Sequence, residues 1–319
     1  MFRWFAAAIV TLSLSGAAAW ANPHSIGTSP VGSSDHVAAL ALVKYATERF
    51  GIDLRLVPQR SSAQVLPLVS SGQVELGLAG APEIAMALSG EGFFEKNAQE
   101  NIVAIGNIYP FRLVLVAQRD SRQDTAAGFA GMRIPHGFFA TSVGDLYMKT
   151  FLAVVGLDQD DMRKVNVGTF NDSREAFMGR RADVAPYVIG TPVWDELTRS
   201  VGPIEILNLA PKGEGENPPP GMNPFFRLVP IEVAAPYYSD DDPYYVLEYD
   251  YLVYTHKDAP DELVEQIATA LAEGAQQMAQ SVRAFNDYDA SRVGLSPGIP
   301  FHPAALRVYR SKNLPTSEE

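Results

Sequence analysis

The chain has no cysteine among its 319 residues. This excludes a disulfide framework, thiolate metal ligands, a cysteine nucleophile and a lipoprotein anchor. Stability must then come from burying apolar surface, and a chain of this length buries enough for two cores.

Positive charge is also scarce. Lys and Arg number 25 against 37 Asp and Glu, which gives a net charge of −12. This balance disfavours nucleic acid and anionic membrane surfaces as partners. An anionic small molecule stays open, because a local site can oppose the global charge.

Familiar catalytic and metal-binding motifs are missing as well. The sequence contains no G-x-S-x-G and no P-loop, and its 5 histidines show neither H-x-H nor H-E-x-x-H spacing. The acidic run Asp240–Asp242 lacks the spacing of an EF-hand loop and is interpreted as a solvated turn. Ser33–His36 places Ser, Asp and His side by side, whereas triad members come from separate segments. We therefore expect no enzyme, no metal and no cofactor.

One apolar run stands at the N-terminus. Residues 1–21 have the pattern of a cleaved signal peptide, with a positive Arg3, an apolar stretch over 5–19 and an A-x-A site at Ala19–Ala21. The stretch is short for a membrane span, although an N-terminal anchor is the alternative. We expect export to the periplasm and a mature chain that begins near Asn22.

The most informative stretch is Val57–Glu83. Its apolar residues form a helical stripe over 65–69 and alternate as in a strand over 74–78. The loops 60–62 and 79–81 would follow parallel strands. Open α/β sheets bind ligands at that edge.

Strand and helix patterns alternate along the whole chain in two halves. Strands are expected at 25–28, 52–57, 102–107, 113–117, 132–134, 161–167, 182–188, 204–208 and 252–254. Helices are expected at 36–50 (capped by Ser34 or Asp35), 143–155, 172–178, 191–200 and 260–278. This alternation predicts the α/β class with two doubly wound domains. We assign domain I to 22–117 and 250–319 and domain II to 118–249, with hinge strands near 109–117 and 248–254.

A ligand between two such domains would contact loops that follow strands and helix N-termini with free N–H groups. Hydroxyl and backbone N–H groups there suit carboxylate oxygens, and Arg60 suits a bidentate clamp. Arg112 either faces the cleft or forms a salt bridge. The candidate binding residues are Thr28, Ser33, Ser34, Asp35, His36, Arg60, Ser61, Ser62, Gly80, Ala81, Tyr109, Gly137, Phe138, Thr141, Ser142, Tyr187, Gly190 and Thr191.

Four segments resemble the TAXI family, the solute receptors of TRAP (tripartite ATP-independent periplasmic) transporters. They are the Gly/Thr-rich loop Gly27–Ser34, the SGQVELGL run Ser71–Leu78, the loop Gly137–Thr141 and the segment Asp183–Pro192. The resemblance implies a type II periplasmic-binding-protein fold, a small carboxylate-bearing solute such as glutamate or a 2-oxo acid, and delivery to TRAP membrane subunits.

Two departures from the family pattern lie near the expected ligand. Asp35-His36 replaces a Tyr-Tyr pair, and Phe138-Phe139 makes the loop of the second domain bulkier. An acidic Asp35 would repel a carboxylate and suits an amine or a hydroxyl-bearing ligand. An ABC-type receptor, a periplasmic ligand sensor and a periplasmic enzyme on the same scaffold are the alternatives.

Overall fold

The computed structural model describes residues 23–119, 129–141, 143–189, 191, 193–209, 222–232, 244–280, 282, 285, 288–296 and 298–317. The expected signal peptide, Ser142, Gly190 and the acidic turn 240–242 lie outside these residues.

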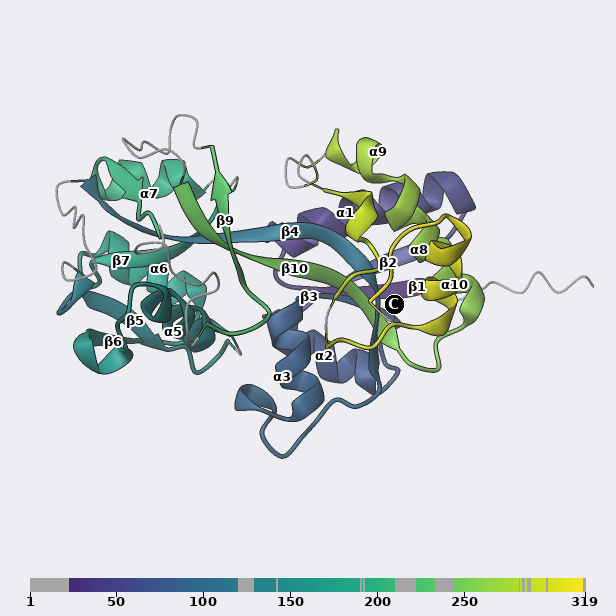
Figure 1. Cartoon of the computed structure of the whole chain (residues 1–319), viewed down its shortest axis with the longest axis horizontal. Coiled ribbons are helices and arrows are strands. Elements are labelled where there is room, and N and C mark those ends of the chain that lie inside the picture. Colours follow the sequence, from purple (N-terminus) through teal and green to yellow (C-terminus); the bar gives the residue numbers. More distant parts are fainter. Residues whose placement is uncertain are drawn as a thin grey trace, which may run out of the picture.

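Two lobes lie side by side along the longest axis of the molecule, and two long strands run through both (Figure 1). These strands are β4 (Ile102–Gln118) and β10 (Tyr244–His256), which pair antiparallel. The first lobe contains β1 (His24–Thr28), α1 (Ser34–Phe50), β2 (Leu54–Pro58), α2 (Ser62–Ser70), β3 (Leu76–Gly80), α3 (Ala81–Ser89), α8 (Asp261–Glu273), α9 (Ala275–Ala279) and α10 (Pro303–Ser311). The second lobe contains β5 (Arg133–Gly137), α5 (Gly144–Val154), β6 (Arg163–Val167), α6 (Phe170–Met178), β7 (Val184–Val188), α7 (Val193–Val201), β8 (Ile204–Ile206) and β9 (Arg227–Ile231).

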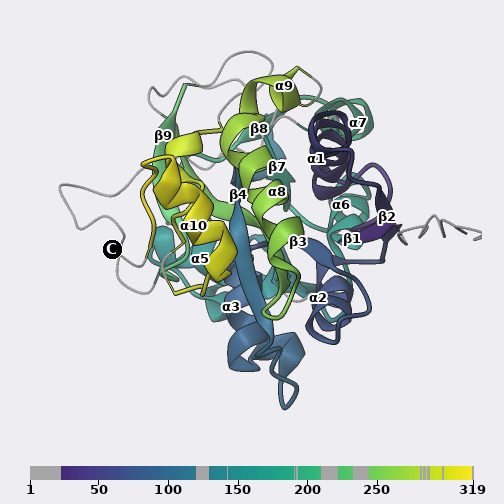
Figure 2. The ribbon, with the colours of Figure 1, turned by 90° about the vertical axis from the view of Figure 1, so that its right-hand side faces the viewer.

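One mixed sheet continues from the first lobe into the second. Its order is β2-β1-β3-β10-β4-β7, with β8 on β4 and β9 on β10, and β5 pairs with β6 in a separate parallel sheet. Strand β1 is parallel to both β2 and β3. The loops after β1 and β2 and the start of α3 therefore meet at one edge of the sheet, as the sequence predicts. Figure 2 shows α8 and α10 on one side of the first lobe, away from α2 and α3.

The two ends of helix α1 are determined by residues next to them in the sequence. Its N-cap is Ser33, whose hydroxyl accepts from the His36 backbone N–H. The expected caps, Ser34 and Asp35, are wrong by one or two positions, because Ser33 is the residue in extended conformation. The helix ends at Gly51, which adopts the left-handed conformation that glycine tolerates best.

Several predicted elements differ from the structure. The two strands expected over 102–117 are the single strand β4, which passes through Pro110, and β10 is much longer than the expected 252–254. The helix expected over 260–278 is divided at Gly274, where a Cβ would meet the Tyr45 ring at 2.9 Å. No loop separates β3 from α3 at residues 79–81, because the strand ends at Gly80 and the helix starts at Ala81.

Candidate ligand site between the lobes

The loop after β1 is closed by its own side chains. Asp35 is 2% exposed, and its carboxylate accepts from the Ser29 backbone N–H at 2.7 Å and the Ser33 hydroxyl at 2.6 Å. Thr28 is fully buried, and its hydroxyl lies 3.0 Å from His36 Nδ1. The predicted residues of this loop therefore form one hydrogen-bonded unit at the N-terminus of α1.

The junction between β3 and α3 lies against a tyrosine of the long strand β10. A Cβ on Gly80 would lie 2.6 Å from Cε2 of Tyr249, so only glycine leaves room for that ring. Ala81 and Glu83 follow in the first turn of α3 and are both buried. The predicted pair Gly80 and Ala81 thus lines the place where the first lobe meets β10.

Four aromatic residues form one face of the β4–β10 ribbon, which we call the aromatic face: Tyr109, Phe111, Tyr249 and Tyr251. Tyr251 stands opposite Tyr109 and Tyr249 opposite Phe111 in the strand register. The ring centroids of these pairs lie 5.3 and 5.0 Å apart, and both pairs are stacked. Side chains two positions apart point to the same side of a strand, so the four rings form a continuous surface.

The second lobe contacts the aromatic face through α5. Tyr147 stacks on Tyr249 with centroids 5.5 Å apart, and their hydroxyls lie 2.6 Å apart. Tyr147 also stacks on Phe170 of α6, which packs against Phe138. Phe138 has φ 38° and lies beneath Gly144, where a Cβ would be 2.1 Å from its ring. Buried rings therefore form a continuous column from the ribbon into the second lobe.

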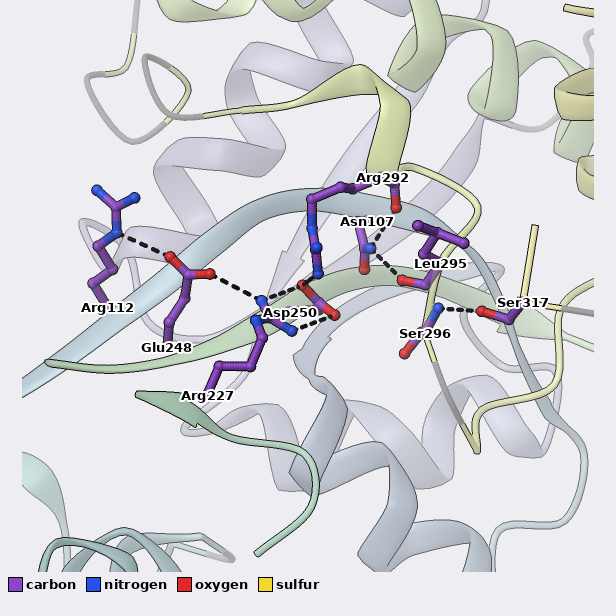
Figure 3. Close-up of polar contacts among 9 residues, drawn as sticks. All are labelled: Asn107, Arg112, Arg227, Glu248, Asp250, Arg292, Leu295, Ser296 and Ser317. Carbon is purple, nitrogen blue, oxygen red and sulfur yellow. Dashed lines mark hydrogen bonds and ion pairs between the residues drawn. The ribbon is translucent and has the colours of Figure 1, made fainter. Parts of the chain in front are cut away.

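The opposite face of the ribbon is ionic (Figure 3). Glu248 stands opposite Arg112 on β4 and Arg227 on β9, and it accepts from both at 3.0 Å. Asp250 accepts from Arg227 at 2.8 and 3.1 Å and from Arg292 at 3.3 Å. Burial lowers the pKa of Arg227, but the two carboxylates outweigh it and raise that pKa. Arg112, which the sequence left open, is therefore a salt-bridged arginine.

A cavity of about 200 Å³ opens on this ionic face. Its walls include Asn107, Arg112, Glu248, Asp250 and Arg292. The Asn107 amide donates to the backbone oxygens of Arg292 and Leu295, which ties the ribbon to the C-terminal segment.

The phenols of the aromatic face are held in their neutral form. Burial raises the pKa of Tyr109 and Tyr251 well above the ordinary value, and the nearby carboxylate of Asp35 raises both further. Burial likewise raises the pKa of Tyr147, and the charge of Glu83 adds to it. These hydroxyls are therefore hydrogen-bond donors at any physiological pH.

Other predicted residues lie away from the aromatic face. Arg60 is exposed, and Ser61 caps α2 without a side-chain hydrogen bond. Ser62 is half-buried in the first turn of α2. Among the described residues, these three have no recorded side-chain contact with the aromatic rings.

Other predicted residues of the second lobe make their contacts within that lobe. Tyr187 packs on Trp194, and its hydroxyl donates to the Thr191 backbone oxygen at 2.8 Å. The Thr191 hydroxyl donates to the backbone oxygen of Val188 at 2.9 Å. Gly137 is exposed, and its N–H donates to Asp145 at 2.8 Å. Thr141 is half-buried at the edge of this loop.

Sequence reasoning missed most of the aromatic face. Of its members it named Tyr109, but not Phe111, Tyr249 or Tyr251, and it also missed Glu83 and Tyr147. The alternation of tyrosines at 249 and 251 is a visible period-two signal. That signal would have placed both rings on one side of a strand.

Two absences hold for the described part of the chain. There, no group of three or more His, Asp or Glu side chains could hold a metal ion. Within the same residues, every helix is too short or too polar to cross a membrane.

The family is shown by a match over most of the chain. Residues 26–312 match the model of the NMT1-like family. The chain belongs to the NMT1-like family. No curated protein matches this NMT1-like chain.

Solved structures resemble this NMT1-like protein in fold. PhnD1 from Prochlorococcus marinus (MIT 9301), in complex with methylphosphonate, is 12% identical with a TM-score of 0.52 over 92% of this chain and 98% of that one. The GluR0 ligand-binding core from Nostoc punctiforme, in complex with L-glutamate, is 13% identical with a TM-score of 0.50 over 83% and 100%. These likenesses establish the type II periplasmic-binding-protein fold that the sequence predicts.

Proposed function

We propose that this NMT1-like protein is a solute-binding receptor that captures a small organic solute between its lobes and does no chemistry on it. The observation that carries the proposal is the aromatic face. Buried rings on the ribbon are contacted by α3 of the first lobe and α5 of the second. A solute enclosed there would be removed from water on all sides, which is how such sites gain affinity.

The two long strands, β4 and β10, are the hinge about which the lobes would open and close to capture a solute. We propose the domain boundaries expected from the sequence, 22–117 with 250–319 and 118–249, because β4 and β10 connect the lobes near these boundaries. In the described conformation the Tyr249 ring lies against Gly80 of the first lobe, and its hydroxyl lies 2.6 Å from that of Tyr147 in the second. Entry of a solute then requires the lobes to part, and closure around it restores the contacts.

The recipient of the solute is proposed to be a membrane transporter. We place ABC-type subunits ahead of TRAP subunits, because the matching family model is NMT1-like and the TRAP assignment depends on four sequence motifs alone. The expected periplasmic location agrees with either recipient. A ligand sensor of the same fold would use the same closed form as its signal.

A thermal-shift screen of the chain from Asn22 onward tests the proposal. Amines, amino acids, organic acids, sugar acids, sulfonates and phosphonates are each added to saturation, because a ligand that binds only the folded state raises the melting temperature. We expect a concentration-dependent shift with one class and no turnover of that compound by NMR. Turnover would support an enzyme, and no shift with any class would overturn the receptor proposal.

Substitutions then locate the site. Tyr109→Phe should weaken binding of the compound found in the screen, whereas Tyr187→Phe, whose hydroxyl already bonds to a backbone oxygen, should not. Arg60→Ala and Ser62→Ala test the loop before α2. Unchanged affinity in both would exclude that loop from the site.

A further inference from the structure

The helix N-termini that meet the aromatic face already carry their own negative charges. α1 has Asp35 and α3 has Glu83 in the first turn, with exposed fractions of 2% and 3%. A helix N-terminus offers about half an elementary positive charge. A carboxylate in the first turn of each helix opposes that positive charge, where an anion receptor would leave it to the ligand.

Backbone donors that would bind an anion are also occupied. The Ser29 N–H donates to Asp35, and the Gly137 N–H donates to Asp145 in the first turn of α5. Both loops are among those from which the sequence predicts carboxylate binding. In each loop, one backbone N–H therefore holds a carboxylate of the chain itself.

The positive side chains of the ribbon lie on its other face. Arg112, Arg227 and Arg292 are paired with Glu248 and Asp250 there (Figure 3). Strand alternation puts Arg112, Glu248 and Asp250 on the side of the ribbon opposite the aromatic face, and the guanidinium groups of Arg227 and Arg292 reach the two carboxylates there.

One buried polar atom lies beside the acids. The Tyr109 hydroxyl, on a residue 3% exposed, makes no hydrogen bond of good geometry in the described part of the chain, although the Ser34 side chain lies near it. The Asp35 carboxylate accepts from neutral groups only, and none of the described salt bridges includes it. A buried carboxylate beside stacked phenol rings is the environment in which ammonium groups bind, through the charge and through the ring faces.

We infer that the solute is a cation, a primary amine or quaternary ammonium compound, held between the aromatic face and the carboxylates of Asp35 and Glu83. This inference deepens the proposed receptor function and rests on it. It departs from the carboxylate-bearing solute that the resemblance implies. The ligand class is decided by the sign of charge at the helix N-termini rather than by the fold.

Isosteric probes of different charge give the test. Choline is compared with its neutral isostere 3,3-dimethylbutan-1-ol and its acidic analogue 3,3-dimethylbutanoate, and putrescine with butane-1,4-diol and succinate. All are measured by thermal shift and calorimetry on the chain from Asn22 onward at one ionic strength. We expect at least one cation to bind about tenfold or more tightly than its neutral isostere, and the acids not to bind.

Charge-removing variants tie the preference to the two acids. Glu83→Gln should lower the affinity for the binding cation about tenfold and leave the neutral isostere unaffected. Asp35→Asn is the second variant, and Glu262→Gln, an exposed acid in the first turn of α8, is the matched control. Cation affinity unchanged in both site variants would overturn the assignment.

The screen separates the ligand class from the receptor function. If succinate, 3,3-dimethylbutanoate or another anion of the wider screen binds and the cations do not, the inferred ligand class is wrong and the receptor function stands. If no compound of any class binds, both are wrong.

Discussion

The hydroxyl pair Tyr147–Tyr249 is the contact whose removal tests most directly how the second lobe is held to the β10 ribbon. Tyr147 belongs to α5 of the second lobe and Tyr249 to the β10 ribbon, and both are almost fully buried. Tyr147→Phe keeps the stacked rings but leaves the Tyr249 hydroxyl buried without this partner. A buried unpaired hydroxyl costs about 1–3 kcal/mol of unfolding free energy.

The double variant Tyr147→Phe/Tyr249→Phe distinguishes a bonded pair from two independent hydroxyls. When both hydroxyls are removed, neither is left buried without a partner. The double variant should therefore lose about 1 kcal/mol of unfolding free energy, the net contribution of one hydrogen bond. The two single losses should therefore exceed the double loss by about 1 kcal/mol or more.

Urea denaturation of the chain from Asn22 onward measures these losses. Of the 3 tryptophans, Trp194 alone follows the expected cleavage site, so its fluorescence reports on the second lobe while circular dichroism reports on both. The pair Tyr187→Phe and Tyr249→Phe is the control, because separate sites add within about 0.5 kcal/mol. Additive losses for Tyr147 and Tyr249 would refute the contact between α5 and the ribbon.

Three further predictions concern stability. Asp250→Ala leaves the half-buried Arg227 guanidinium without its two-pronged partner and should cost about 2–4 kcal/mol by urea denaturation; a loss under about 1 kcal/mol would show that the ionic face is solvated. Gly144→Ala should destabilise by about 1–3 kcal/mol despite the better helix propensity of alanine, because its Cβ meets the Phe138 ring, and a stabilised variant would contradict that packing. Burial raises the pKa of Asp183, but hydrogen bonds from an arginine of β5 outweigh it and lower that pKa. The contribution of Asp183 to the free energy of unfolding is therefore present above about pH 4 and lost as the pH falls further. Asp183→Asn should make the urea midpoint less dependent on pH between about pH 3 and 6, and an unchanged dependence would refute this.

Much of the fold follows from local sequence pattern. Strands β1 and β3 and helices α1 and α6 lie within a few residues of their expected positions, because hydrophobic period and capping residues act over one or two turns. The break in the long C-terminal helix was missed, because apolar periodicity continues through Gly274 and the Tyr45 ring that packs there is distant in sequence.

The candidate site was predicted less completely, for a related reason. Loops that follow parallel strands can be predicted from the sequence, which is why Thr28, Asp35 and Gly80 are among its candidate residues. Which side chains oppose one another across β4 and β10 depends on strand register, which includes two shifts near Tyr251. No local pattern encodes that register.

The sequence by itself determined the α/β class, the expected export signal and the acidic character of the loop at Asp35, because each depends on residues that are neighbours in the chain. Only the tertiary structure decided that β4 and β10 form one ribbon with an aromatic face and an ionic face. It also decided that Arg112 pairs with Glu248 while Tyr147 reaches Tyr249. These pairs join residues about a hundred positions or more apart, and only packing and register bring them together.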